Sequence, residues 1–250
     1  MNIDINSDLG ESFGNWSMAD DLALLQVVSS ANIACGFHAG DPRVMLQTVE
    51  ACAAVDVAVG AHPGFPDLVG FGRRKMELTP HEIRTDVMYQ IGALQAMCKA
   101  VGVPLHHVKA HGAMQNMMMT DYEMSVAFVQ AVAATMEEPL VYAQPGSATE
   151  RAAVDAGVRV ARELFADRAY LANGDLAPRS MADSVMHDID VITDRMLSMM
   201  RGAPIETIDG STIRLEGDTI CVHSDTPDAL RIAQSLKNSL ISAEFVISPV

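Results

Sequence analysis

Short apolar runs alternate with amphipathic stretches along most of the chain. The apolar runs predict strands at residues 3–6, 29–35, 57–61, 105–110, 140–143, 158–164 and 218–223. Between them, apolar residues at helical spacing predict helices at 20–28, 42–55, 80–100, 122–135, 148–156, 189–200 and 226–243. Strands that alternate with helices are typical of parallel sheets. About seven β/α units of this kind predict an α/β fold, a closed or nearly closed barrel.

Two features interrupt this alternation without dividing the chain. Residues 205–215 contain the turn signal Asp209-Gly210 between β-prone runs, which predicts a hairpin. The stretch after residue 61 is rich in glycine and proline, as functional loops often are. No linker or repeat of fixed length appears, and residues 244–250 form a short closing tail. We therefore predict a single domain over residues 1–250.

Composition narrows the classes of function. The chain has 250 residues, 49% of them hydrophobic, and a net charge of −15, which disfavours nucleic acid as a partner. No apolar run reaches the roughly 18 residues of a membrane helix, and the N-terminus lacks the form of a secretory signal. The four cysteines are scattered through apolar elements, as packed, reduced thiols are. These features predict a soluble, cytoplasmic protein.

Polar side chains gather where the predicted strands stop. In the segment NIACGFHAGDP, an apolar run ends in a turn with Gly36 and Gly40, followed by Pro42 at a helix start. Histidines also follow the strands that end near residues 61, 110 and 223, whereas His81 and His187 lie elsewhere. Because strand ends meet on one face of a β/α barrel, we predict one shared site. Its candidate residues are Asp8, Glu11, His38, Asp41, His62, Lys109, His111, Glu163, Asp167, Arg168, His223 and Asp225.

Three kinds of chemistry fit this set of residues. Clustered imidazoles and carboxylates could bind a zinc-like ion that activates water. Alternatively, Asp8 or a histidine could accept a proton without a metal while Lys109 stabilises an oxyanion. Lys109 is costly to bury unless it is paired, so we expect Asp8 or Glu163 beside it. The third possibility is a protein that binds a ligand or partner without catalysis. The sequence contains no Walker A motif, so its motifs do not indicate ATP binding.

Several segments in unchanged order resemble the LamB/YcsF family. They are DINSDLGESFG, ANIACGFHAGDP, GAHPGFPDLVGFGRR, VKAHGAMQN, ELFADRAY, LAPRS and CVHSDTP, from about Asn2 to Pro227. The resemblance implies a seven-stranded β/α barrel of the glycoside hydrolase/deacetylase type. It also implies cleavage of the 5-oxoproline lactam to L-glutamate, coupled to hydrolysis of ATP with Mg²⁺, in a complex with subunits B and C. The chain departs from the family pattern at Ala110, Met114-Gln115 and Ser224.

The resemblance suggests roles for individual residues. Asp8 or His111 would activate water, and Lys109 with His38 and His62 would stabilise charge on oxygen. Arg73 or Arg74 would pair with the substrate carboxylate. The other residues expected to bind substrate are Glu11, Asp41, Asn116, Glu163, Asp167, Arg168, His223 and Asp225. We expect Lys109→Ala to abolish turnover without unfolding the chain.

Two alternatives to this function stay open. One is a stand-alone metal-dependent amidase or deacetylase with a divalent metal at the His/Asp cluster, and the other is a non-catalytic scaffold protein of the complex.

Overall fold

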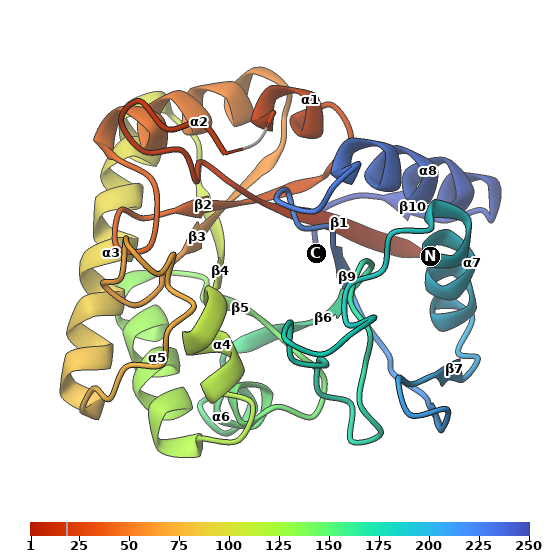
Figure 1. The fold of residues 1–250 in the computed structure, drawn as a ribbon. Helices are drawn as coiled ribbons and strands as arrows, with labels where there is room; N and C mark the ends of the chain where they lie inside the picture. Colours follow the sequence, from red (N-terminus) through yellow and green to blue (C-terminus); the bar gives the residue numbers. More distant parts are fainter. Residues whose placement is uncertain (19) are drawn as a thin grey trace.

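Seven parallel strands surround a common axis, and helices enclose them (Figure 1). The structure is a computed structural model that describes residues 1–18 and 20–250. The barrel strands are β1 (Asn2–Leu9), β2 (Ser30–Ala34), β3 (Ala58–His62), β4 (Leu105–Lys109), β5 (Leu140–Ala143), β6 (Arg159–Phe165) and β9 (Thr219–Cys221). They are neighbours in this order, and β9 pairs with β1 to close the ring. The predicted seven-stranded α/β barrel is confirmed.

The helices follow the predicted pattern with one addition. They are α1 (Asp21–Leu25), α2 (Pro42–Ala54), α3 (Pro80–Val101), α4 (Gly112–Met117), α5 (Tyr122–Thr135), α6 (Ala148–Asp155), α7 (Ile189–Met200) and α8 (Ala229–Ser242). Helix α4 was not predicted, because six residues span fewer than two turns and cannot display a helical period. Helix α1 is shorter than expected and ends before the apolar pair Val27-Val28, which is buried.

The C-terminal third adds two pieces to the barrel. Strands β7 (Ile205–Glu206) and β8 (Thr212–Ile213) form the predicted hairpin, with Asp209 and Gly210 in its loop. Within the closing tail, strand β10 (Val246–Ile247) pairs in parallel with Asn2 and Ile3 of β1. Two paired residues are too few to show a strand pattern in the sequence.

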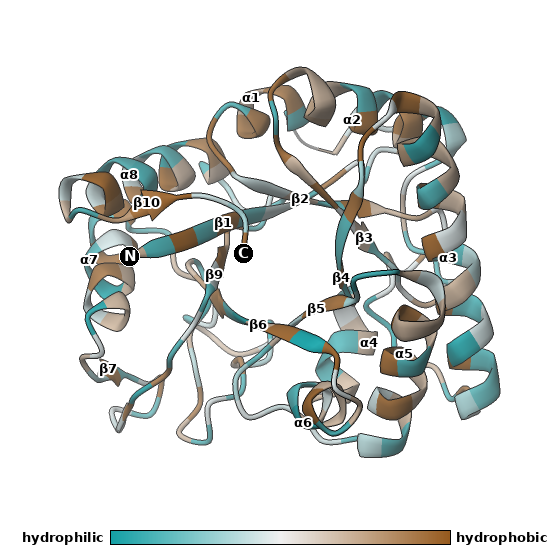
Figure 2. Cartoon of the chain, turned by 180° about the vertical axis from the view of Figure 1, so that it is seen from behind, coloured by the Kyte–Doolittle hydropathy of each residue, from teal (hydrophilic) through white to brown (hydrophobic). Residues whose placement is uncertain are grey.

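Side chains alternate between the two faces of each barrel strand. Ile3 and Ile5 of β1 belong to the hydrophobic core. Asp4 and Asn6, which alternate with them, are buried on the other face and form hydrogen bonds with Thr219. The same alternation is visible along β1 in Figure 2. Because successive strand residues face opposite sides, the apolar set packs under the helices and the polar set fills the barrel interior.

The four cysteines are unpaired and buried, as expected from their apolar surroundings. Over residues 1–18 and 20–250, the structure contains no helix with both the length and the apolar character needed to span a bilayer.

Candidate active site

A cavity of about 590 Å³ opens where the strands of the barrel end. Its wall receives side chains from residues at or just after six strands, including Asp8, His62, His111, Gln144, Phe165 and His223. The parallel strands bring these residues together because all their carboxyl ends lie on one face. The predicted shared site at the strand ends is thus a physical pocket.

Lys109 lies beneath the cavity between two carboxylates. Its Nζ is 2.8 Å from Asp8 Oδ1 and 2.8 Å from Glu163 Oε1, and the lysine side chain is 1% exposed. Nζ also lies 3.1 Å from Cys221 Sγ. The pairing expected for a buried lysine is therefore found with both candidate acids.

These contacts determine the protonation states of Lys109 and Asp8. Burial by itself would lower the pKa of Lys109, but the facing carboxylates of Asp8 and Glu163 hold it well above its usual value. Burial would likewise raise the pKa of Asp8, yet the positive charges that His62 and Lys109 can carry hold it well below the usual range. Both groups are therefore ionised near neutral pH.

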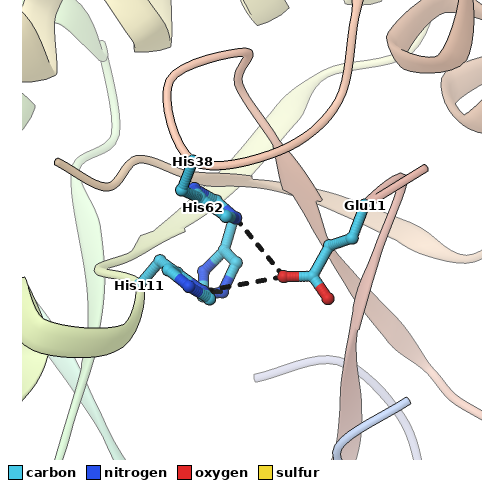
Figure 3. Close-up of side chains that lie close together, drawn as sticks. All are labelled: Glu11, His38, His62 and His111. Atoms are coloured by element: carbon cyan, nitrogen blue, oxygen red, sulfur yellow. Dashed lines mark hydrogen bonds and ion pairs between the residues drawn. The ribbon is translucent and has the colours of Figure 1, made fainter. Parts of the chain in front are cut away.

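Three histidines and one glutamate converge in the site (Figure 3). His38 Nε2 lies 3.3 Å from Glu11 Oε1, His111 Nδ1 lies 3.0 Å from His62 Nε2, and His62 Nε2 lies 3.5 Å from Asp8 Oδ2. Each of the four offers a ligand atom within 4.8 Å of the others, so this cluster could hold a metal ion.

Burial controls protonation in this cluster. It lowers the pKa of His38 and of His111 well below the usual value, with neighbouring histidines adding to the effect. Burial and the nearby Asp8 carboxylate raise the pKa of Glu11 well above the ordinary glutamate value. Neutral imidazoles are the form in which histidine binds metals.

His223 and Asp167 form a hydrogen-bonded pair at the cavity. His223 Nδ1 lies 2.9 Å from Asp167 Oδ1, and Thr226 Oγ1 donates to the same carboxylate. Because the carboxylate only accepts, the proton lies on Nδ1 and Nε2 of a neutral His223 is an acceptor. This histidine lines the cavity, whereas Asp167 is fully buried behind it.

Cationic side chains line the outer part of the cavity. Arg73 Nη2 lies 2.5 Å from Asp225 Oδ2, and Arg179 Nη2 lies 3.7 Å from Asp225 Oδ1. Arg168 is buried and donates to the backbone carbonyls of Ala177 and Ser184. Within residues 1–18 and 20–250, no carboxylate forms an ion pair with Arg168, and burial lowers its pKa to about 10.

The predicted site residues occupy three kinds of position. Those in the cavity wall are Asp8, Glu11, His62, Arg73, His111, Asn116, Arg168, His223 and Asp225. A second set contacts residues of the wall from beneath or behind, namely His38, Lys109, Glu163 and Asp167. Because Gln115, Lys109 and the neighbouring strands cover it, Glu163 does not reach the cavity.

Two further predicted substrate-binding residues, Asp41 and Arg74, lie outside the wall and serve the scaffold. Asp41 is the N-cap of α2, where its carboxylate accepts from the amides of Arg43 and Val44, and it also accepts from Gly14. Arg74 pairs with Asp67 and is turned toward solvent. Loop sequence alone could not separate Arg73 from Arg74, because their directions depend on how the loop packs.

Sequence reasoning also missed several residues of the site. Gln144 follows β5 directly, so the strand-end rule could have found it. Asn32 points into the barrel and donates from Nδ2 to Asp8 Oδ1 at 2.8 Å. Further wall residues come from loops and from α4, which carry no period that marks them: Lys75, Gln115, Met119, Thr120, Leu171, Asp175 and Arg179.

Comparison with known proteins places the chain in a family. The profile of the LamB/YcsF family matches residues 3–250. The A subunit of 5-oxoprolinase from Bordetella pertussis is 49% identical over 238 residues, which cover 95% of this chain and 94% of that protein. The corresponding A subunit from Pyrococcus furiosus is 46% identical over 240 residues, covering 96% of this chain and 94% of the relative.

A solved structure agrees with these sequence matches. The lactam utilization protein from Thermus thermophilus superposes with a TM-score of 0.94 at 44% identity, over 100% of both chains. Together with the profile match and the curated relatives, this similarity extends over the whole barrel. The chain belongs to the LamB/YcsF family.

Proposed function

We propose that this chain is the A subunit of an ATP-dependent 5-oxoprolinase and opens the lactam of 5-oxoproline to L-glutamate in the cytoplasm. In this proposal it works with subunits B and C, and ATP with Mg²⁺ serves the assembled enzyme. The relatives named as A subunits of 5-oxoprolinase and the lactam utilization protein support the substrate class.

One observation carries the proposal: a single cavity contains acid/base groups and a buried guanidinium that forms no ion pair with a carboxylate of the described residues. The substrate is a small cyclic amide with a carboxylate. Its amide needs groups that move protons, which Asp8 and His223 can supply, and its carboxylate needs a cation, which Arg168 can supply.

His223 is the group best oriented for proton transfer. Its Nδ1 is held by Asp167, so Nε2 can accept a proton from the attacking water and later give it to the ring nitrogen as the C–N bond breaks. Asp8 is a weaker base because of its low pKa and would orient the water. His111 is less suited, because its Nε2 donates to Phe71 O and its Nδ1 faces His62 Nε2 at 3.0 Å, which leaves no room for a water.

In this mechanism, Lys109 does not have the role that the family resemblance suggested, which was to stabilise charge on the substrate oxygen. Its ammonium contacts Asp8, Glu163 and Cys221 and is 1% exposed, so it holds Asp8 in place rather than reaching a substrate oxygen. Phosphorylation of the lactam oxygen by ATP, with release of ADP, would make the ring carbon a better electrophile. Addition of water and cleavage of the C–N bond would then give γ-glutamyl phosphate, which a second water would hydrolyse to L-glutamate and inorganic phosphate.

The test is glutamate formation from 5-oxoproline with ATP and Mg²⁺, by the chain alone and with subunits B and C. We expect product only in the mixture. His223→Ala should lower kcat by about 10²–10⁴-fold. Exposed His187 provides the matched control, since His187→Ala should leave the rate unchanged. A His223→Ala enzyme with the parent rate would remove His223 from the mechanism.

The His/Glu cluster favours one other function, a stand-alone metal-dependent amidase or deacetylase. That function predicts hydrolysis by the chain alone, without ATP. A non-catalytic scaffold, the third alternative, predicts that cavity substitutions leave the activity of the assembled enzyme intact. Absence of glutamate in every mixture would refute the proposed function.

A further inference from the structure

Four side-chain atoms meet at one edge of the cavity with the spacing of metal ligands. Glu11 Oε1 is 3.3 Å from His38 Nε2 and 3.6 Å from His111 Nδ1, which in turn is 3.0 Å from His62 Nε2. Zinc–ligand bonds of ~2.0–2.1 Å in a tetrahedron put neighbouring ligand atoms about 3.4 Å apart. The observed separations lie on both sides of that value.

The far nitrogens of two rings determine where their protons are. His62 Nδ1 lies 2.9 Å from the Lys109 carbonyl, and His111 Nε2 lies 2.8 Å from the Phe71 carbonyl. A carbonyl only accepts, so both of these nitrogens carry hydrogen. Metal-binding histidines are held in the same way by carbonyls or carboxylates.

The two ring nitrogens that face each other, His62 Nε2 and His111 Nδ1, then require a cation between them. In neutral rings, His62 Nε2 and His111 Nδ1 are both lone pairs, yet they face each other at 3.0 Å. Two acceptors repel at this distance unless a positive charge lies between them. An extra proton would satisfy only this pair, whereas one metal ion would also satisfy Glu11 Oε1 and His38 Nε2.

We propose that Glu11, His38, His62 and His111 bind one divalent transition-metal ion of the zinc class (Figure 3). Three imidazole nitrogens and one carboxylate oxygen suit zinc and its neighbours. Mg²⁺ prefers six oxygen ligands in an octahedron, so the proposed ion is distinct from the Mg²⁺ that accompanies ATP.

The four ligands are not equivalent. The His38 ring stacks on the His111 ring, with centroids 3.6 Å apart and planes within 4°, so the rings must tilt apart before both can direct a lone pair at one ion. His111 is tied to Phe71, whereas His38 Nδ1 is unpartnered among the described residues. His38 is therefore the ring that turns, and His62, His111 and Glu11 form the fixed part of the site.

A second group of potential ligands nearby is excluded by Lys109. Asp8, Cys221 and His223 also converge, but Lys109 Nζ lies 2.8 Å from Asp8 Oδ1 and 3.1 Å from Cys221 Sγ. An ammonium in this position repels a dication. Burial also raises the pKa of Cys221 well above its usual value, which keeps the thiol protonated.

The site opens to the cavity through Glu11, His62 and His111, which line its wall. A bound ion there would polarise a carbonyl oxygen or lower the pKa of a water. This catalytic use rests on the proposed function, whereas the binding of the ion does not.

The first measurement is Co²⁺ binding by the purified full-length chain after chelation. We expect uptake of one Co²⁺ per chain with visible d–d absorption of a four-coordinate site, and displacement by Zn²⁺. Metal analysis of the untreated protein should find one transition-metal ion per chain. Aqueous-type absorption without saturation would overturn the proposal in favour of a shared proton.

Variants identify the ligands. His62→Ala and His111→Ala should each weaken Co²⁺ binding by at least about 100-fold, Glu11→Gln should also weaken it, and His38→Ala should have the smallest effect. The controls Cys221→Ser, from the second group, and His187→Ala, on the surface, should bind Co²⁺ as the parent does. Circular dichroism establishes that each variant is folded. Equal binding by His62→Ala and His187→Ala would refute the site.

The two proposals fail separately. Co²⁺ binding needs neither ATP, 5-oxoproline nor partner subunits. A chain that binds Co²⁺ but yields no glutamate in the assembled enzyme would refute the proposed function and leave the metal site intact. Full glutamate formation by a chain that binds no transition metal would do the reverse.

Discussion

Lys109 links two carboxylates that would otherwise be buried without a counter-charge. The sequence led to the expectation that Lys109→Ala would spare the fold, but this side chain contacts Asp8 and Glu163 at 2.8 Å each. Removing one member of a buried ion pair costs more than the pair contributes, because the remaining charge stays desolvated. Lys109 therefore affects stability as well as activity.

We expect Lys109→Met to lower the free energy of unfolding by about 3–5 kcal/mol, measured by urea denaturation. Exposed Lys99, in the last turn of α3, is the control, since Lys99→Met should change stability by less than about 0.5 kcal/mol. Adding Glu163→Gln to Lys109→Met should recover part of the loss. A loss below about 1 kcal/mol would show that the carboxylates are not held by Lys109 in this way.

Asp167 gives the fold an acid-sensitive contact. Burial would raise its pKa, but the positive charge that His223 can carry and hydrogen bonds from His223 and Thr226 hold the pKa well below the ordinary value of 3.8. A carboxyl group with a lower pKa in the folded state stabilises that state above its unfolded pKa. This contribution is lost as the pH falls below about 4.

We therefore expect the free energy of unfolding of the parent chain to fall more steeply below about pH 4 than that of Asp167→Asn. At neutral pH, Asp167→Asn should be less stable by about 1–3 kcal/mol, because a charge-assisted hydrogen bond is weakened. Denaturant unfolding at a series of pH values checks both points. Parallel pH curves for the two proteins would contradict this assignment.

At the scale of single elements, Gly60 of β3 has no side chain and so leaves room for His107 of β4. A Cβ at Gly60 would lie 2.1 Å from His107 Nε2 and 2.3 Å from Cε1. His107 fills that space, stacks on Tyr142 and donates from Nε2 to Asn32 Oδ1 at 2.7 Å. The β3–β4 register also shifts between Val59 and Gly60.

Gly60→Ala should destabilise the fold by about 1–3 kcal/mol, because the methyl group must displace a packed ring. Gly92, inside α3, is the matched control. A Cβ there meets nothing within 4 Å, so Gly92→Ala should stabilise the chain by about 0.5–1 kcal/mol. Thermal unfolding of both variants measures the difference. Equal melting temperatures for the two would indicate that His107 can move aside without cost.

At the scale of the whole molecule, closure connects the two ends of the chain. Strand β1 pairs with β2, β9 and β10, so the N-terminal strand is bonded to elements from the beginning and the end of the sequence. No part of such a ring can leave without breaking strand pairs on both sides. The barrel should therefore unfold as one unit.

We expect a single urea transition that coincides by circular dichroism and by intrinsic fluorescence. Native-state hydrogen exchange should give the amides of β2 and β9 the same highest free energy of opening, although 184 residues lie between the end of β2 and the start of β9. Two separate transitions, or a β9 that opens well before β2, would contradict the single domain predicted from the sequence.

The sequence alone predicted the order of elements and the face that carries the site. Periodic apolar residues mark strands and helices locally. Capping residues mark helix starts, as the capping box of Thr79 and Glu82 with Pro80 does for α3. The rule that strand ends share one face then brought Asp8, His62, His111 and His223 to one cavity. Family motifs added the expected substrate class.

Only the tertiary structure decided which of these residues act together. Arg73 faces the cavity while Arg74 pairs with Asp67, and Lys109 is held by carboxylates from β1 and β6. Local sequence encodes secondary structure because its periodicity repeats over a few residues. Side-chain partners depend on barrel closure and loop packing, which join positions far apart in the chain and leave no period between them.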